Sequence, residues 1–322
     1  MRVMAGIAGR RLLQLIPVLV GASFITFAIL NALPGNAALA ATGLYASAAQ
    51  IAAAAKQLGL NHPYFDRYWL WIWHALHGQL GVSYIAKQQV TTLIVQRFPV
   101  SFELVTLSIF CALAISIPVA VLSARKPLGV FDWVARVFAM LSLSIPSFVM
   151  CVLLLLVFAV KLNWLPTSGF VPLSQGILPN LRTMALPVMV QVSILFGSYT
   201  RILRGDMVDQ LRYEDYVVTA RSKAISERRL LISHVFKNSV FSLITIVGTQ
   251  FGTLVAGGAI AETIFGLPGI GALLLQSITN KDIPVVQGLV VIVATLVVFM
   301  NLITDLLYMG LDPRVKYGST AS

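Results

Sequence analysis

The sequence predicts an all-α, polytopic membrane protein. Of its 322 residues, 58% are hydrophobic and only 11% are charged, and the mean hydropathy is +0.86. With this few charged groups, the chain cannot cover the surface of a water-soluble globule of this size with polar residues. It must therefore use lipid as its solvent. Because backbone polar groups have no water to bond in the bilayer, the apolar segments must be helices that pair those groups internally.

Six apolar segments approach the length of about 20 residues that a helix needs to cross the hydrocarbon layer. They cover approximately residues 12–31, 100–122, 138–160, 184–203, 240–261 and 285–308. An even number of spans places both termini on the same side. The chain then divides into an N-terminal end with the first span (1–31), an external helical segment (32–97), a five-helix core (98–310) and a C-terminal tail (311–322).

Basic residues are concentrated on one side of these predicted spans. Of the 23 Lys and Arg residues, 16 fall in segments on the side of the N-terminus and 7 on the other. Because cytoplasmic loops carry the excess of Lys and Arg, both termini are predicted to be cytoplasmic. The net charge of +11 is then explained by this topology and by contact with anionic lipid, and no nucleic-acid partner is expected.

The first span could alternatively be a cleaved signal peptide, because Ala38-Leu39-Ala40 resembles a cleavage site. Its apolar stretch is longer than the roughly 7–15 residues of a signal-peptide core. We therefore expect the span to be retained.

The external segment is predicted to contain two helices. Alanines within residues 46–55 favour the first, which Gly59 can close, and residues 64–77 form an aromatic, amphipathic helix suited to the outer headgroup level. The segment could be an interfacial scaffold or a surface that receives an extracytoplasmic protein. His74 and His77, three residues apart without a carboxylate at close spacing, make a poor metal site, so no metal is predicted.

Few ionisable residues lie within the predicted spans. Glu103 and Asp305 are near span ends, where a charge costs less than at the bilayer centre. An ion-coupled transporter would be expected to place such groups near the midplane. Pro118 and Pro146 should kink the second and third spans, because proline removes a backbone donor.

The fifth span carries a strip of small and polar residues. Gly248 and Gly252 form a G-x-x-x-G pair, accompanied by Gln250, Thr253 and Gly257. Small residues let another helix approach closely. The strip therefore indicates either static helix packing or a helix that lines a pathway.

Residues 211–238 form the only long charge-dense stretch. The pattern predicts a short helix with one small, apolar face on which a partner could dock. That face comprises Tyr213, Tyr216, Val217, Ala220 and Ala224. Glu214 and Asp215 lie largely off it, and Ser226 followed by Glu227 is typical of the start of a second helix.

No catalytic or cofactor-binding motif is present. Gly269-Ile270-Gly271 lacks the third glycine and the preceding strand of a nucleotide fingerprint, and no G-x-x-x-x-G-K-[ST] sequence occurs. No nucleophile with a paired base occurs either. We expect no enzymatic activity and no cofactor in this chain, so any ATP and Mg would be bound by separate subunits.

Several motifs, in order along the chain, carry a family resemblance. The loop contains Glu214-Asp215-Tyr216, Thr219-Ala220-Arg221 and Ser226-Glu227-Arg228-Arg229, and the ends contain Arg10-Arg11-Leu12-Leu13-Gln14, Glu262-Thr263-Ile264-Phe265 and Asp312-Pro313-Arg314. Together they resemble the permease subunits of bacterial ABC importers of the dipeptide, oligopeptide and nickel class. The resemblance covers essentially the whole chain.

This resemblance implies that the loop at 204–238 contains a coupling helix that sits in a cleft of an ATPase subunit. It assigns ATPase coupling to Tyr213, Glu214, Asp215, Tyr216, Val217, Ala220 and Ala224. The family usually has Gly where Ala224 stands. Because Gly permits a positive φ that Ala resists, the turn is expected to differ here.

The resemblance also implies partners and a place in the cell. The partners are a second, different permease chain, two ATP-binding subunits and an extracytoplasmic solute-binding protein, and the place is the bacterial inner membrane. The predicted function is to form half of the pathway for di- or oligopeptides, with the fifth span lining it. Within the family, the alternative substrate is nickel or another small solute. The alternatives outside the family are an autonomous secondary transporter, which should show midplane charges and inverted repeats, and a non-transporting membrane scaffold or receptor.

Overall fold

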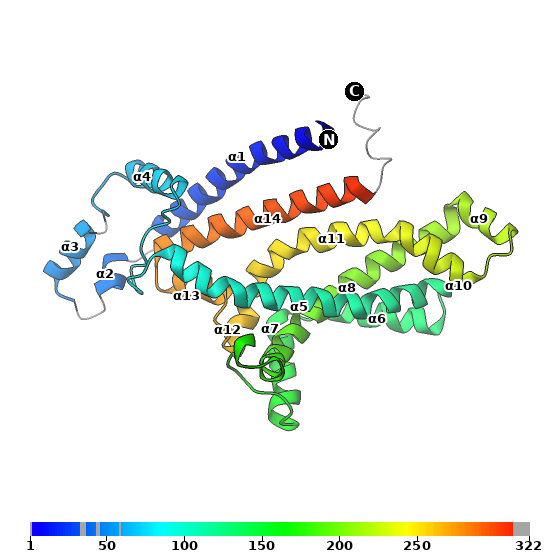
Figure 1. Ribbon diagram of the computed structural model, residues 1–322. Coiled ribbons are helices and arrows are strands. Elements are labelled where there is room, and N and C mark those ends of the chain that lie inside the picture. The colour runs from blue at the N-terminus through cyan, green and yellow to red at the C-terminus, as the bar shows by residue number, and fades with distance from the viewer. Residues whose placement is uncertain (1, 33–36, 43–45, 58, 312–322) are drawn as a thin grey trace. The chain divides into compact units, whose positions relative to one another are not determined.

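The computed structural model describes residues 2–32, 37–42, 46–57 and 59–311 (Figure 1). The all-α prediction is confirmed, because the regular elements of this described part are all helical and β structure is limited to one isolated bridge, between Val82 and Gln89. The predicted tail at 311–322 lies outside the described residues except for its first position.

The helices run in the following order along the chain. The N-terminal part contains α1 (Arg2–Ala32), α2 (Ala37–Thr42), α3 (Ala48–Gln57), α4 (Tyr64–Leu76) and α5 (Val90–Arg125). The middle contains α6 (Val130–Ser144), α7 (Ser147–Leu154) with a π-helical continuation (Leu155–Lys161), a short 3₁₀ turn (Leu173–Gln175) and α8 (Ile177–Tyr213). The last part contains α9 (Asp215–Ser222), α10 (Glu227–Arg229), a π-helical turn (Leu230–Val235), α11 (Phe236–Gly257), α12 (Ala259–Phe265), α13 (Ile270–Thr279) and α14 (Ile283–Leu311).

Four helical segments are each long and apolar enough to cross a membrane. These are α5, α8, the stretch Glu227–Val255 and α14, and two bent helix pairs would raise the number to six. The predicted spans at 100–122, 184–203 and 285–308 lie inside α5, α8 and α14. The predicted first span lies inside α1, whose described apolar part is Ile16–Ala32.

The predicted third span, 138–160, is not one kinked helix. It contains the junction of α6 and α7, whose axes differ by 105°. Ile145 is extended, with φ −82° and ψ 120°, and Pro146 caps α7. Proline has no N–H to continue α6 and disfavours helical backbone at the preceding residue, so the helix breaks here. At Pro118, by contrast, α5 continues without a break.

The predicted fifth span, 240–261, also has different bounds. The helix begins earlier, at Phe236, and ends at Gly257, and α12 starts at Ala259. Next, α12 and α13 form a pair bent by 88°. Apolar composition alone does not reveal such a break, because both arms of the pair are as apolar as a continuous span.

The described chain divides into two compact units. The first comprises residues up to 102, 255–263 and 268–299, and the second comprises 103–254, 264–267 and the residues from 300. In the second unit, α5, α8, α9, the π-helical turn and α11 share a core that includes Leu203, Met207, Leu230 and Val235. α6 packs along α8 there. A Cβ on Gly197 would lie 2.6 Å from the carbonyl oxygen of Ala139, so this crossing requires a residue without a side chain.

In the first unit, aromatic contacts pack α4 against α1. The Tyr68 ring lies 5.2 Å from that of Phe24 and 5.4 Å from that of Phe27, centroid to centroid. Its hydroxyl lies 3.0 Å from Ser23 Oγ. Asp282, immediately before α14, accepts hydrogen bonds from Ser83 Oγ and from the backbone N–H of Tyr84 at 2.9 Å. The loop before α5 is therefore held to the start of α14.

Candidate functional site

The charged loop folds as the helix that its pattern predicts, α9. The apolar stripe faces largely inward, because Val217 and Ala220 are only 1% and 6% exposed and belong to the core of the second unit. Tyr216 packs against the same core, and its hydroxyl donates to Gln210 Oε1 at 2.6 Å. Burial raises the pKa of Tyr216, and the charge of Glu214 raises it further. The phenol therefore stays protonated as a donor.

The outward face of α9 is different from the stripe. Val218 is 69% exposed, and the exposed residues around it are Asp215, Thr219 and Ser222. At the ends of the predicted stripe, Tyr213 is 76% exposed and belongs to α8. Residues 215, 218, 219 and 222 follow the helical spacing i, i+3, i+4, i+7, so they form one continuous surface. Together with the exposed Arg221, that surface is the part of α9 that a partner can reach.

Ala224 adopts the conformation that its side chain was expected to resist. Its φ is +56°, in the left-handed region that favours glycine. The N–H groups of Ala224 and Ile225 bond back to the carbonyls of Arg221 and Ala220, which closes the end of α9. The backbone at Ala224 is therefore one that glycine adopts without strain and that alanine adopts at a cost.

Ala224→Gly should therefore stabilise the loop. A left-handed alanine costs about 1–2 kcal/mol, and the greater flexibility of unfolded glycine offsets about 0.5–1 kcal/mol of the gain. We expect a small rise in the melting temperature of the purified chain. Ala224→Val, with a β-branched side chain at the same φ, should lower it. A lower melting temperature for Ala224→Gly would contradict the strain.

The small-residue strip of α11 divides into two kinds of position. Gly248 is a packing residue, because a Cβ there would lie 1.6 Å from Thr304 Oγ1 of α14. Gly252 is buried, whereas Thr253 and Gly257 are exposed. Gln250 donates weakly to Ser198 Oγ at 3.4 Å, and its Oε1 is buried without a hydrogen-bond partner. Thr253, Gly257 and Gln250 thus remain the candidates for lining a pathway.

Besides Asp282, two more buried carboxylates were given no structural role from the sequence, where Glu262 appeared only within a family motif. Glu262 of α12 is 1% exposed and accepts hydrogen bonds from Ser101 Oγ at 2.6 Å and from the N–H of Ala272 at 2.8 Å. Ser101 Oγ in turn accepts from the N–H of Ile270 at 2.8 Å. This network joins both arms of the bent pair α12–α13 to α5 within the first unit. The signal in the sequence was an acid among apolar residues.

The second carboxylate, Asp132, lies in the first turn of α6. Its side chain is completely buried, and Arg204 of α8 binds it with two hydrogen bonds, of 2.9 Å from Nε and 2.8 Å from Nη2. The N–H of Leu128 donates a third bond at 2.9 Å. This pairing fixes the start of α6 against α8. The sequence showed an Asp and an Arg 72 positions apart, with nothing to link them.

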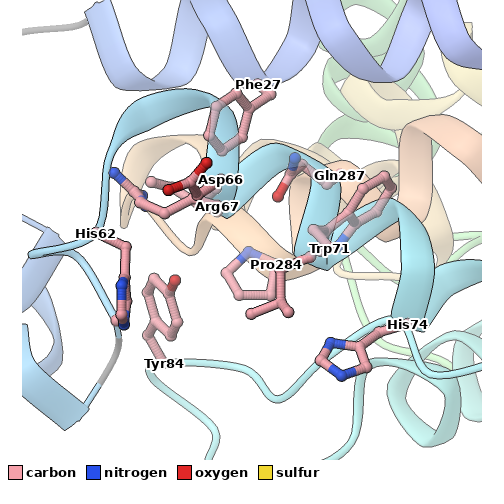
Figure 2. A pocket seen from close by; sticks show the side chains of 12 residues that line it. Phe27, His62, Asp66, Arg67, Trp71, His74, Tyr84, Pro284 and Gln287 are labelled. Carbon is pink, nitrogen blue, oxygen red and sulfur yellow. The ribbon is translucent and has the colours of Figure 1, made fainter.

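The external segment contains a cavity of about 340 Å³. Figure 2 shows Asp66, Arg67 and Trp71 of α4 and Pro284 and Gln287 of α14 around it. Trp71 Nε1 and Gln287 Nε2 are buried without hydrogen-bond partners in the described structure. Two unpartnered donors suit a ligand group that accepts hydrogen bonds.

Residues before α5 complete this cavity. Tyr84 lines it, and burial raises its pKa although the charge of Arg67 acts in the opposite direction. His62 and His74 line it as well. Within the described residues, no group of three His, Cys, Asp or Glu could hold a metal ion. The polar side chains of the lining can donate and accept hydrogen bonds.

The aromatic helix is confirmed as α4, but its tryptophans divide between two surroundings. Trp69 and Trp73 are 64% and 61% exposed, whereas Trp71 lines the cavity. Phe65 and Leu76 extend the exposed face. The positions 65, 69, 73 and 76 follow one side of the helix, as an interfacial helix requires.

Sequence comparison decides the family. The model of the family described as "Binding-protein-dependent transport system inner membrane component" matches residues 116–317, and that of its N-terminal region matches residues 4–105. The chain belongs to this family. It is therefore a permease and a multi-pass membrane protein, as its sequence motifs and apolar helices predict.

Two relatives of the permease are similar over almost their full lengths. The oligopeptide transport system permease protein AppB of Bacillus subtilis (strain 168) is 35% identical over 317 residues, which cover 98% of this chain and 100% of the relative. The dipeptide transport system permease protein DppB of Escherichia coli (strain K12) is 34% identical over 332 residues, which cover 96% of this chain and 98% of the relative. Membership implies partner ATPase and binding-protein subunits.

Proposed function

We propose that this permease forms half of the translocation pathway of an ABC importer for di- or oligopeptides. A second, different permease chain forms the other half, two partner subunits bind ATP and Mg and hydrolyse the ATP, and an extracytoplasmic binding protein delivers the substrate. The peptide substrate is supported by the relatives, which are named for oligopeptide and dipeptide transport. Nickel or another small solute is the alternative within the family.

One observation supports the proposed coupling to ATP hydrolysis: α9 has an inner face packed into the core and an outer face open to a partner. Val217 and Ala220 pack beside α8 and α11 residues, so a force applied to α9 acts on helices that cross the membrane. ATP-driven movement of the partner ATPases would displace α9 and change the access of the pathway. The outer surface, Asp215, Val218, Thr219 and Ser222, is the proposed contact.

The contact is tested by Val218→Asp, with Val218→Thr as the matched control that keeps the β-branched shape. Aspartate replaces the one apolar side chain of this surface with a charge, so the ATP-binding subunits should co-purify with the variant at least tenfold less well, equivalent to about 1.4 kcal/mol. Uptake of a labelled dipeptide should fall in parallel. The threonine variant should retain both.

One outcome would count against this contact. Full retention of the ATP-binding subunits and normal substrate-stimulated hydrolysis by Val218→Asp would remove the outer face of α9 as the contact. Ala220→Trp discriminates the two faces, because overpacking a buried position costs about 1–3 kcal/mol. It should lower the melting temperature of the permease without any ATPase present, whereas Val218→Asp should not. Uptake of Ni²⁺ in place of dipeptide would assign the alternative substrate.

We further propose that the loop 204–238 and both termini face the cytoplasm and that residues 32–97 face outside. The asymmetry of Lys and Arg supports this orientation. Ser226 is exposed, so a cysteine placed there can report its side. An impermeant thiol reagent should label Ser226→Cys in inverted vesicles and leave it unlabelled in intact cells. Labelling of Ser226→Cys in intact cells would show that the loop faces outside, opposite to the proposed orientation.

A further inference from the structure

A small cavity in the second unit lies between α5, α6 and α8 and is lined by apolar and polar side chains. Its volume is about 80 Å³, several times the roughly 10–15 Å³ that one water molecule requires. Ser123 of α5, Arg136 of α6 and Thr200, Arg201 and Arg204 of α8 supply its polar lining.

The cavity contains polar atoms that the protein leaves unpaired. Ser123 and Thr200 are 0% and 3% exposed, and the described structure offers no hydrogen-bond partner to either hydroxyl or to Nε of Arg136. Leaving buried polar groups unpaired costs free energy, so such groups are normally satisfied by protein, water or a ligand. Two hydroxyls and a guanidinium N–H can all donate to the oxygens of an anion.

The net charge around the cavity also favours the binding of an anion. Asp132 is the carboxylate that pairs with the arginines of the cavity, and Arg204 donates a hydrogen bond to each of its two oxygens. Arg136 approaches the same carboxylate only to 3.5 Å, and Arg201 has no acidic partner in the described residues. Three guanidinium groups therefore meet one carboxylate, which leaves an excess of two positive charges for an external anion.

The rim of the cavity is apolar and exposed. Met140 and Leu143 line the cavity and are 61% and 39% exposed. Phe138 and Leu141 on the same helix are 60% and 52% exposed. Exposed apolar side chains of a membrane protein contact acyl chains or another subunit, and contact with acyl chains would bring the headgroup of a lipid to this basic group. Basic pockets between membrane helices on the cytoplasmic side bind anionic headgroups.

We propose that this cavity binds the phosphate of an anionic phospholipid, with Arg136 and Arg201 as its charged ligands and Ser123 and Thr200 as its hydroxyl donors. The lipid would lie in the cytoplasmic leaflet in the orientation proposed above. Because the site links α5, α6 and α8, its occupancy would stabilise their packing. The inference requires the chain to be in a membrane, but it does not depend on the transported substrate.

The test is lipid binding to the full-length, delipidated permease in detergent, measured by native mass spectrometry. Phosphatidylglycerol should bind more tightly than phosphatidylcholine, whose headgroup carries no net charge. Arg201→Gln should weaken phosphatidylglycerol binding about fivefold, as the loss of one Arg near an anionic headgroup predicts. Thr200→Val, which keeps the shape but removes the hydroxyl, should also weaken it.

Arg212→Gln is the matched control, because Arg212 is exposed on the same helix and outside the cavity. It should leave the affinity within about twofold. Equal binding of the two lipids would overturn the proposal, as would equal losses in Arg201→Gln and Arg212→Gln, which would indicate a diffuse surface charge. Full displacement of the lipid by excess inorganic phosphate would assign the site to a free anion. Unchanged melting temperatures of the variants exclude misfolding as the cause of a loss.

Discussion

Replacing Asp132 with alanine is expected to destabilise the second unit by about 3–5 kcal/mol, the usual cost of leaving one partner of a buried ion pair without the other. Arg204 would keep its charge but lose two hydrogen bonds, of 2.9 and 2.8 Å. The N–H of Leu128 would lose its acceptor as well. The melting temperature in detergent should therefore fall steeply, together with the yield of inserted protein.

Two further variants show whether the buried charge is the cause. Arg136→Gln removes only the 3.5 Å contact of a side chain that is 38% exposed, so it should cost less than about 1 kcal/mol. Arg204→Leu combined with Asp132→Ala removes both charges and should recover part of the loss. A single Asp132→Ala variant as stable as Arg136→Gln would show that the pair contributes nothing to stability.

The spans could be predicted from the sequence because their signal is local. A run of about 20 apolar residues has few solutions other than a membrane helix, and α5, α8 and α14 contain the predicted runs. The positions of the helix breaks could not be predicted as accurately as the spans. Pro118 and Pro146 both predict a kink, but α5 continues through the first and the chain turns by 105° at the second. The surrounding packing decides which proline ends a helix.

The face of α9 illustrates a second limit. Periodicity identified Val217 and Ala220 as members of one apolar stripe, and that much is confirmed by their burial. Periodicity does not say what covers a stripe. Here the chain's own core covers it, so the proposed ATPase contact moves to the opposite face around Val218. At Ala224 the turn overrides the preference of alanine against a positive φ.

The buried polar residues could not be paired from the sequence. Asp132 and Arg204 are 72 positions apart, and Ser101 and Glu262 are 161 positions apart. Tertiary packing determines which of these residues pair, and no local sequence pattern encodes the pairing. What the sequence does show is that an acid among apolar residues requires a partner, because burying an unpaired charge is costly. Glu262 is such a residue.

Glu262→Ala is expected to loosen the bent pair α12–α13 in the first unit. The change leaves Ser101 Oγ and the N–H of Ala272 without their acceptor. A hydrogen bond to a charged group contributes about 1.5–3 kcal/mol, so the loss should be at least about 2 kcal/mol. It also opens a void at Gly269, where a Cβ would lie 2.2 Å from Glu262 Cδ. The amides of α13 should exchange with deuterium faster, and dipeptide uptake should fall.

Glu227→Ala provides the control, because Glu227 is also an acid near a helix start but is 57% exposed and paired with Arg221 at the surface. Such surface pairs contribute about 0–1 kcal/mol, so exchange in α13 should be unchanged. Glu262→Gln retains one acceptor oxygen and should give an intermediate exchange rate. If Glu262→Ala and Glu227→Ala gave the same protection of the α13 amides, the buried network would not be what holds the bent pair. The Ser101 hydroxyl connects Glu262 to the N–H of Ile270. If the network holds the bent pair, Ser101→Ala should speed deuterium exchange from the first turn of α13 onward. If it does not, Ser101→Ala should leave the exchange of the α13 amides unchanged.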